Sequence, residues 1–305
     1  MNELLDIFAK DLRHLQGLSD NTIKAYTSDV LDFLQRLVVE DVDELKQIQY
    51  DEIRDYLMLL HANSISRVSQ CRKISALKSF FGFLRKNQII ETDPTAKVTV
   101  PKVDVHLPGV LNENEVTMLL DYAQETAARS QDYFDCRNTL LVELLYSTGM
   151  RVSELVKLTW GDVDLASRSI RVRDAKGGKD RVVLFNDHVL KALHSLVEKL
   201  HSTNTNTSVQ SADVRQEPIF KNKHGGCLNV RTARQIVYDL ARAAGLQNVH
   251  PHTFRHCAAT HLLDGGADIR IVQELLGHSN LQTTQKYTHT SVGRLLEKYH
   301  SAFPR

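Results

Sequence analysis

The chain has 305 residues, of which 42% are hydrophobic, so it can bury real cores and is long enough for about two domains. Its 38 basic and 37 acidic residues leave a net charge of +1, which excludes a protein that holds nucleic acid by bulk charge alone. No charge-free run of about 20 apolar residues occurs, so we expect no membrane span, and the acidic start at residues 1–6 is unlike a signal peptide. Four cysteines without paired spacing favour a reducing, cytoplasmic location: Cys71, Cys136, Cys227 and Cys257.

Helical spacing dominates residues 1–96. Ser19 or Asp20 fits the N-cap of a helix, because hydrophobic side chains follow at helical intervals from Ile23 to Leu37. Residues 64–86 then combine an apolar stripe with basic residues and no acidic one. A helix with one apolar and one purely basic face can follow DNA phosphates, whereas an ordinary solvated face usually mixes both signs. We therefore predict DNA contacts at Arg67, Arg72, Lys73 and Lys78.

The end of this helical region is rich in proline. Pro94, Pro101 and Pro108 fall within residues 91–109, where little helical pattern remains. Proline at this density is typical of an extended linker. The predicted division is residues 1–96 for an N-terminal domain, 97–109 for the linker and 110–305 for a second domain.

The second domain places an arginine beside a buried helix. Residues 139–146 are nearly all apolar, and Gly149 ends that helix shortly before Arg151. A charged side chain at such a place needs a partner. Arg151 is therefore either a functional residue or a member of an internal salt bridge, for which Glu154 is the nearest candidate.

Residues 169–185 read as a β-hairpin with Lys176 at its turn, where a lysine can enter a groove or simply remain solvated. Residues 201–217 have the polar composition of a loop. Arg231 and Arg234 share one face of the helix that follows, so we predict both as phosphate contacts.

The segment that begins at His250 carries the densest chemistry. Pro251 fits the first position of a helix, and His252 and Arg255 then share one helix face. An arginine fork matches phosphate oxygens, and histidine can donate a hydrogen bond or transfer a proton. His252 and His256 could also pair on a metal, but a metalloprotease would need a glutamate where Thr253 stands. We therefore expect no metal.

Tyr287 lies next to Lys286 and near His289. A tyrosine with a pKa of about 10 is a poor nucleophile, and cationic neighbours are what would make it reactive. His278 follows Gly277 at a predicted helix end. The histidines at 256 and 261 are more simply explained as structural residues.

Taken in order, these residues resemble the tyrosine recombinases of the phage integrase family, and most closely the bacterial Xer type. The similarity rests on Arg151, Lys176, residues 252–255, residues 275–289 and the N-terminal segment 18–26. Two features depart from the family pattern: residues 201–217 form a longer connection, and Phe254 stands where leucine is common.

The resemblance implies a mainly α fold. Its N-terminal four-helix SAM-like core-binding domain and its α-rich catalytic domain, with a small three-stranded antiparallel sheet, would clamp double-stranded DNA. It also implies that Tyr287 attacks a DNA phosphate to form a 3′-phosphotyrosyl link, without metal, ATP or other cofactor. Arg151 and Arg255 would hold the non-bridging oxygens, and Lys176 would protonate the leaving oxygen. His252 and His278 would add hydrogen bonds and proton transfer.

The same resemblance implies a cytoplasmic homo- or heterotetramer with a second Xer-type recombinase, and a DNA translocase of the FtsK type is a candidate partner. Chromosome-dimer resolution at a dif-like site is the expected role. The alternatives are an integrase or transposase of a mobile element and, from another class, a DNA-binding protein without catalysis. For the tail, residues 291–305, we expect an apolar helix that docks on a neighbouring protomer, with docking on its own domain as the alternative.

Overall fold

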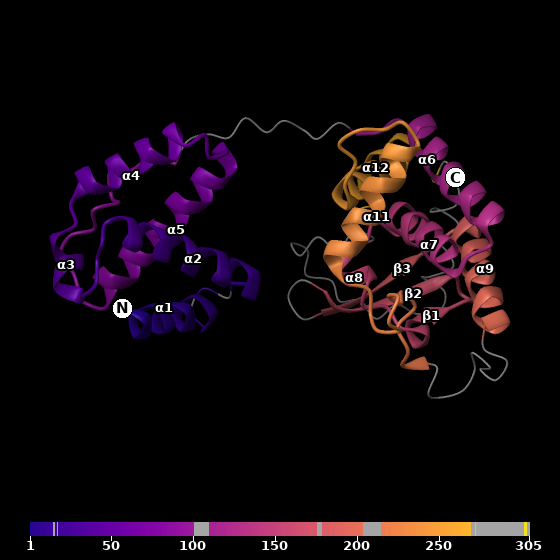
Figure 1. Cartoon of the computed structure of the whole chain (residues 1–305), viewed down its shortest axis with the longest axis horizontal. Helices are drawn as coiled ribbons and strands as arrows, with labels where there is room; N and C mark the ends of the chain where they lie inside the picture. Colours follow the sequence, from indigo (N-terminus) through magenta and orange to yellow (C-terminus); the bar gives the residue numbers. More distant parts are fainter. Residues whose placement is uncertain are drawn as a thin grey trace. The chain divides into compact units, whose positions relative to one another are not determined.

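The computed structural model describes residues 1–14, 16, 18–100, 110–175, 179–203, 215–269, 272 and 302–303. The chain divides into two units, Met1–His106 and Leu107–Arg305 (Figure 1). This division falls within the proline-rich segment that predicts a linker. None of the described helices is long and apolar enough to cross a membrane.

The first unit is a group of amphipathic helices whose ends are set by short-range capping. The Ser19 side chain accepts a hydrogen bond from the backbone N–H of Thr22, which confirms Ser19 as the predicted N-cap. Asp41 and Glu44 form a reciprocal capping box at the next helix. The helices are α1 (Asn2–His14), α2 (Asp20–Arg36), α3 (Val42–Gln47), α4 (Tyr50–Ala62) and α5 (Arg67–Lys86).

Aromatic side chains from α1, α2 and α5 fill the core of this unit. The Phe80 ring lies 5.2 Å from that of Phe8 and 5.6 Å from that of Phe81, in the edge-to-face arrangement that aromatic pairs prefer. The apolar stripe predicted for residues 64–86 is buried from Ile74 onward. Val68 is 65% exposed because it lies in the first turn of α5, which extends beyond the core.

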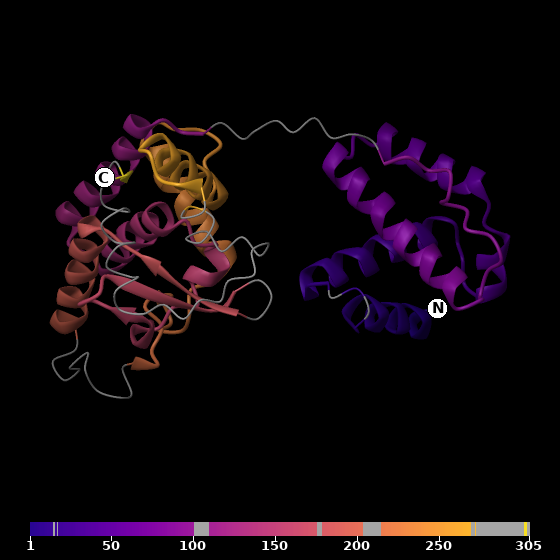
Figure 2. The same ribbon diagram turned by 180° about the vertical axis from the view of Figure 1, so that it is seen from behind.

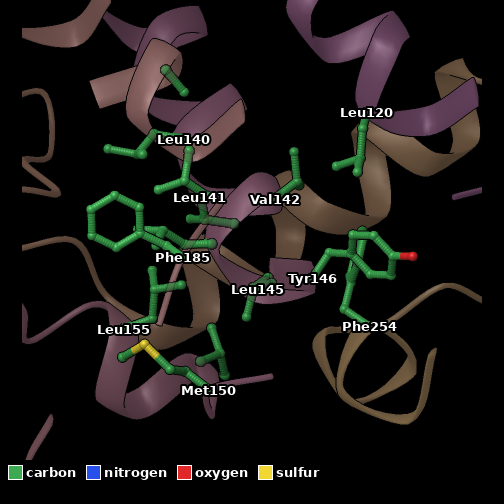
Figure 3. Packing of buried hydrophobic residues seen from close by; sticks show 14 of the residues in the cluster. Leu120, Leu140, Leu141, Val142, Leu145, Tyr146, Met150, Leu155, Phe185 and Phe254 are labelled. Carbon is green, nitrogen blue, oxygen red and sulfur yellow. The ribbon is translucent and has the colours of Figure 1, made fainter. Parts of the chain in front are cut away.

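The second unit is built around α7 (Tyr133–Thr148), which Figures 1 and 2 show in the middle of it. Every residue from Thr139 to Thr148 is buried, as its apolar composition predicts. Helices α6 (Glu113–Ser130), α9 (Asp187–Thr203) and α12 (Pro251–Asp264) pack against it. Figure 3 shows side chains of α7 meeting Met150, Leu155, Phe185 and Phe254 in one core.

A small antiparallel sheet completes this unit. The predicted hairpin is confirmed as β2 (Ser169–Ala175) paired with β3 (Lys179–Leu184), and a short strand, β1 (Val163–Asp164), pairs with the other edge of β2. The fold class is thus mainly α with a three-stranded antiparallel sheet, as expected. The other elements are α8 (Val152–Leu155), a 3-10 turn at Trp160–Asp162 and α11 (Val230–Ala243).

The end of the chain contacts its own unit. Ala302 and Phe303 are buried, and the Phe303 ring lies 4.9 Å from the ring of Tyr146 on α7. Gly265 permits this approach, since a Cβ there would lie only 2.0 Å from the carbonyl oxygen of Ala302. The predicted tail helix, with its apolar stripe at residues 292–299, lies outside the described residues.

Candidate active site

Arg151 and Arg255 are distant in sequence and meet at the C-terminal end of α7. Gly149 caps that helix with φ 58°, a left-handed conformation that glycine adopts without strain. This sharp turn leads directly into Arg151, the N-cap residue of α8. Arg255 on α12 donates from Nη1 to the carbonyl oxygen of Gly149 at 2.7 Å. The turn therefore receives one arginine along the chain and a second from α12.

Glu154 holds Arg151 in place. The Glu154 carboxylate accepts from Nη1 of Arg151 at 2.9 Å and from the Arg151 backbone N–H at 2.9 Å. The internal salt bridge considered from the sequence is thus present. Arg181 on β3 binds the same carboxylate through Nη1 at 3.1 Å and Nη2 at 2.7 Å. Burial alone would raise the pKa of Glu154, but the hydrogen bonds and charge of Arg181, together with two hydrogen bonds from Arg151, lower it to about 2.

Positive charge exceeds negative charge around this carboxylate. Arg255 has its pKa lowered to about 10, first by burial and then by the positive charges of Arg151 and Arg181, while Glu154 opposes the shift. The guanidinium stays charged at neutral pH. Among the described residues, Arg151 and Arg181 bind this one carboxylate and Arg255 lies near them, so the site can accept an anion such as a phosphate.

His252 lies at the same site, in the first turn of α12. Its ring is exposed overall, yet partial desolvation lowers its pKa, and nearby positive groups lower it further. In decreasing order of effect these groups are Arg234, Arg255, His256 and Arg151. Neutral imidazole is therefore the main form near pH 7, with one nitrogen able to donate and the other to accept a proton.

The other histidines of α12 differ in role. His261 is buried, where Nδ1 lies 2.9 Å from the Tyr146 hydroxyl and Nε2 lies 3.0 Å from the carbonyl oxygen of Leu111. These partners confirm the structural interpretation of His261. His256 is exposed beside His252. Among the residues with described positions, no three His, Cys, Asp or Glu side chains gather as a metal site.

Three of the six predicted catalytic residues have described positions, and the structure brings these three together: Arg151, His252 and Arg255. Lys176, His278 and Tyr287 lie outside the described residues. The structure adds Arg181, which sequence reasoning missed. Arg181 could have been found from the predicted hairpin, in which it pairs with the apolar Val172 of β2. Paired residues of neighbouring strands share a face, so this pairing places Arg181 on the buried face of the sheet.

The predicted DNA contacts of α5 differ in exposure, and two of them pair with aspartates of α2. The ammonium of Lys73 lies 3.2 Å from Asp29 and 2.9 Å from Asp32, and its side chain is only 13% exposed. Arg72 also pairs with the buried Asp29. These two charges stabilise the packing of α5 on α2, so a DNA contact by either would compete with that pairing. Arg67 is exposed and Lys78 is half-buried.

The predicted contacts of the second unit lie on α11. Arg231 and Arg234 are both exposed there. Arg234 also lies close enough to His252 to be the strongest charge acting on its pKa. This position links the predicted contact surface of α11 to the arginine-rich site.

Comparisons with known proteins agree with this architecture. Residues 109–294 match the Phage integrase family, and residues 5–88 match the N-terminal SAM-like domain of phage integrases. The chain is 35% identical to the tyrosine recombinase XerC of Bifidobacterium longum (strain DJO10A), over 99% of this chain and 97% of that protein. It is 37% identical to the tyrosine recombinase XerD of Oceanobacillus iheyensis, over 99% of this chain and 98% of that protein.

Among solved structures, the fold is similar to that of the XerH site-specific recombinase bound to palindromic difH substrate. The TM-score is 0.66 at 23% identity, over 96% of this chain and 82% of that one. The family matches cover both units, and the relatives cover nearly the whole chain. The chain therefore belongs to the phage integrase family and is a tyrosine recombinase, an enzyme that cuts and rejoins DNA at specific sites through a phosphotyrosine intermediate.

Proposed function

We propose that Arg151 and Arg255 hold the non-bridging oxygens of the DNA phosphate at which this recombinase cuts. The observation that carries the proposal is the convergence of these two arginines around the turn at Gly149, beside the buried carboxylate of Glu154. Guanidinium forks match phosphate oxygens and stay charged at neutral pH. Fixed positive charge of this kind stabilises the charge that develops on the phosphoryl oxygens during transfer.

The other four catalytic roles follow the resemblance to the family. The Tyr287 oxygen forms a bond to phosphorus while the bond from phosphorus to the 5′ oxygen breaks, and Lys176 gives a proton to that leaving oxygen. His252 and His278 hydrogen-bond the phosphate and transfer the tyrosine proton. The lowered pKa of His252 supports this role, because a neutral imidazole can accept a proton.

Rejoining reverses these steps with the 5′-hydroxyl of another strand. The phosphotyrosyl ester keeps the energy of the phosphodiester bond, so the cycle needs no ATP. The arginines supply the charge neutralisation for which other phosphoryl-transfer enzymes use Mg²⁺. We accordingly propose a reaction without metal or other cofactor.

We further propose that this enzyme resolves chromosome dimers at a dif-like site in the cytoplasm. It would act as a tetramer, alone or with a second Xer-type recombinase, under the control of a DNA translocase of the FtsK type. The similarity to proteins named XerC and XerD supports this role. The fold of XerH, whose structure contains a difH substrate, is consistent with it.

Trapping of the covalent intermediate tests the catalytic proposal. The substrate is a nicked duplex that carries the dif-like sequence of the host chromosome, from which a short fragment diffuses away after cleavage. The wild-type protein should form a covalent complex that survives denaturing electrophoresis in excess EDTA. Tyr287→Phe should bind the same duplex and form no complex.

Tyr299→Phe is the matched control, because Tyr299 is the other tyrosine of the C-terminal segment. This variant should form the complex as the wild type does. A complex that persists in Tyr287→Phe and disappears in Tyr299→Phe would move the nucleophile to Tyr299. Loss of the complex in EDTA, with recovery on addition of Mg²⁺, would contradict the metal-free mechanism.

A further inference from the structure

Arg181 is a charged residue on the inner face of the sheet. It lies on β3 directly across from Val172 of β2, and Val172 is only 1% exposed. Paired residues on neighbouring strands point to the same face, so Arg181 also points into the core. Its side chain is 10% exposed. A buried charge requires a partner of opposite charge, so the partner of Arg181 indicates the role of this residue.

The partner of Arg181 is Glu154. Both terminal nitrogens of Arg181 bind the two carboxylate oxygens, in the bidentate geometry that makes arginine–carboxylate pairs strong. The Nε atom of Arg181 is buried and has no hydrogen-bond partner within the described part of the chain. The guanidinium of Arg181 therefore binds Glu154 with both of its terminal nitrogens.

Glu154 is shared between two arginines with different exposure. Its Oε1 accepts from Nη1 of Arg181 and from Nη1 of Arg151, while Arg151 remains 29% exposed. One carboxylate can neutralise only one of these two cations. Because Arg181 is buried and bidentate, it is the better match, and the charge of the more exposed Arg151 is left in excess.

Without Arg181, the balance would change. Glu154 is 9% exposed and would then have Arg151 as its remaining ion-pair partner. The ion pair between Glu154 and Arg151 would then strengthen, because a largely buried carboxylate is unstable without a cation beside it. A phosphate oxygen would then have to compete with Glu154 for the Arg151 guanidinium.

We propose that Arg181 is a positioning residue of the active site: by neutralising Glu154, it allows this carboxylate to orient Arg151 while the charge of Arg151 remains available to the DNA phosphate. The inference rests on the proposed function of Arg151 and adds a residue outside the six predicted catalytic positions.

A double-mutant cycle tests the inference. Single-turnover formation of the covalent complex is measured at saturating protein for the wild type, Arg181→Met, Glu154→Gln and the double variant. Arg181→Met should slow the chemical step about 10- to 100-fold, because the Glu154 carboxylate then pairs with Arg151 and competes with the DNA phosphate. Adding Glu154→Gln should recover at least about tenfold of that loss, because the neutral amide no longer competes.

A purely structural role predicts the opposite for the double variant. Removing the second partner would then add a further defect or leave the rate unchanged. A double variant no faster than Arg181→Met would therefore overturn the inference, as would an Arg181→Met rate equal to that of the wild type. Arg171→Met is the matched control, since Arg171 forms an exposed pair with Asp180 on the same sheet, and its rate should stay within about twofold of the wild type.

If Arg181→Met does not fold, Arg181→Lys decides the question. Lysine keeps the positive charge but lacks the bidentate fork, so the inference expects a rate within about tenfold of the wild type. A loss as large as that of Arg151→Ala would overturn it. The wild-type protein in the same assay separates this inference from the proposed function: if it forms no complex, the catalytic proposal fails, whereas a working wild type with an equally active Arg181→Met removes only the inference.

Discussion

Among the described residues, each unit contains a cluster in which two or more basic side chains bind a buried carboxylate. In the N-terminal unit, Asp29 is 5% exposed and Asp32 accepts from further basic residues beside it. Lys73 pairs with both aspartates, Arg72 pairs with Asp29, and Arg36 pairs with Asp32. Every basic group in this cluster has a carboxylate partner, which is the arrangement expected of a cluster that stabilises packing.

The cluster of the C-terminal unit has a different balance. Arg151 and Arg181 share the single carboxylate of Glu154, and Arg255 beside them donates to a neutral backbone carbonyl. Burial, followed by repulsion from Arg151 and Arg181, lowers the pKa of Arg255. A bound anion would relieve this repulsion. Among the described residues, two carboxylates bind three cations in the N-terminal cluster, whereas one carboxylate binds Arg151 and Arg181 in the C-terminal cluster, and we expect this charge balance to separate a binding site from a structural ion pair.

The largest effect should follow removal of a phosphate-holding arginine from the C-terminal cluster. Arg151→Ala or Arg255→Ala should lower the single-turnover rate of covalent-complex formation by about 10² to 10³, the usual cost of one donor to a developing oxyanion. Binding of uncut DNA should weaken much less. A rate within about threefold of the wild type would mean that the phosphate binds elsewhere, and that the C-terminal cluster is not a binding site that differs from the N-terminal one.

The next effect concerns the acid stability of the same cluster. The pKa of Glu154 is about 2 in the folded protein and near 4.5 in an unfolded chain. A lowered pKa contributes stability above the unfolded pKa, and this stability is lost as the pH falls through the folded pKa. The contribution at neutral pH should be on the order of 3 kcal/mol.

Chemical denaturation of the wild type and Glu154→Gln from pH 7 to pH 2.5 measures this contribution. The free energy of unfolding should fall more steeply with acid in the wild type than in the variant, mainly below about pH 4.5. Parallel curves for the two proteins would show that Glu154 is not held by the arginines in the folded state.

The smallest effect should come from the N-terminal cluster. Asp29→Ala leaves Lys73 with Asp32 as a remaining partner and lets the half-exposed Arg72 turn to solvent, so the free energy of unfolding should fall by only about 1–3 kcal/mol. Urea unfolding measures it. The exposed Arg13–Asp20 pair is the control, and Arg13→Gln should change stability by less than about 0.5 kcal/mol.

This variant also sharpens the comparison through catalysis. If the N-terminal cluster is structural, folded Asp29→Ala should form the covalent complex at a rate within about threefold of the wild type at saturating DNA. A loss comparable to that of Arg255→Ala would mean that the cluster also acts in catalysis, and that the balance of charge does not separate the two roles.

Much of the local structure follows from short stretches of sequence. The N-cap at Ser19, the buried helix that ends at Gly149 and the hairpin of residues 169–185 depend on neighbours a few positions away, and all three agree with the structure. Such features are predictable because capping, helical spacing and turn chemistry act over one or two turns of chain. The residue types at positions 252 and 255 were likewise enough to point to phosphate chemistry, whereas Arg151 could equally have been a member of an internal salt bridge.

Tertiary structure alone decided which charges remain available to a ligand. A basic face without acidic residues predicted DNA contacts on α5. However, Lys73 pairs with Asp29 and Asp32 of α2, a helix that α3 and α4 separate from α5 in the sequence. In the same way, Arg181 looks like an ordinary strand residue until β3 brings it to Glu154. Whether a charge is neutralised depends on which distant groups share its surroundings after folding, because the Coulomb interaction depends on distance in space and on burial, and neither can be read from spacing along the chain.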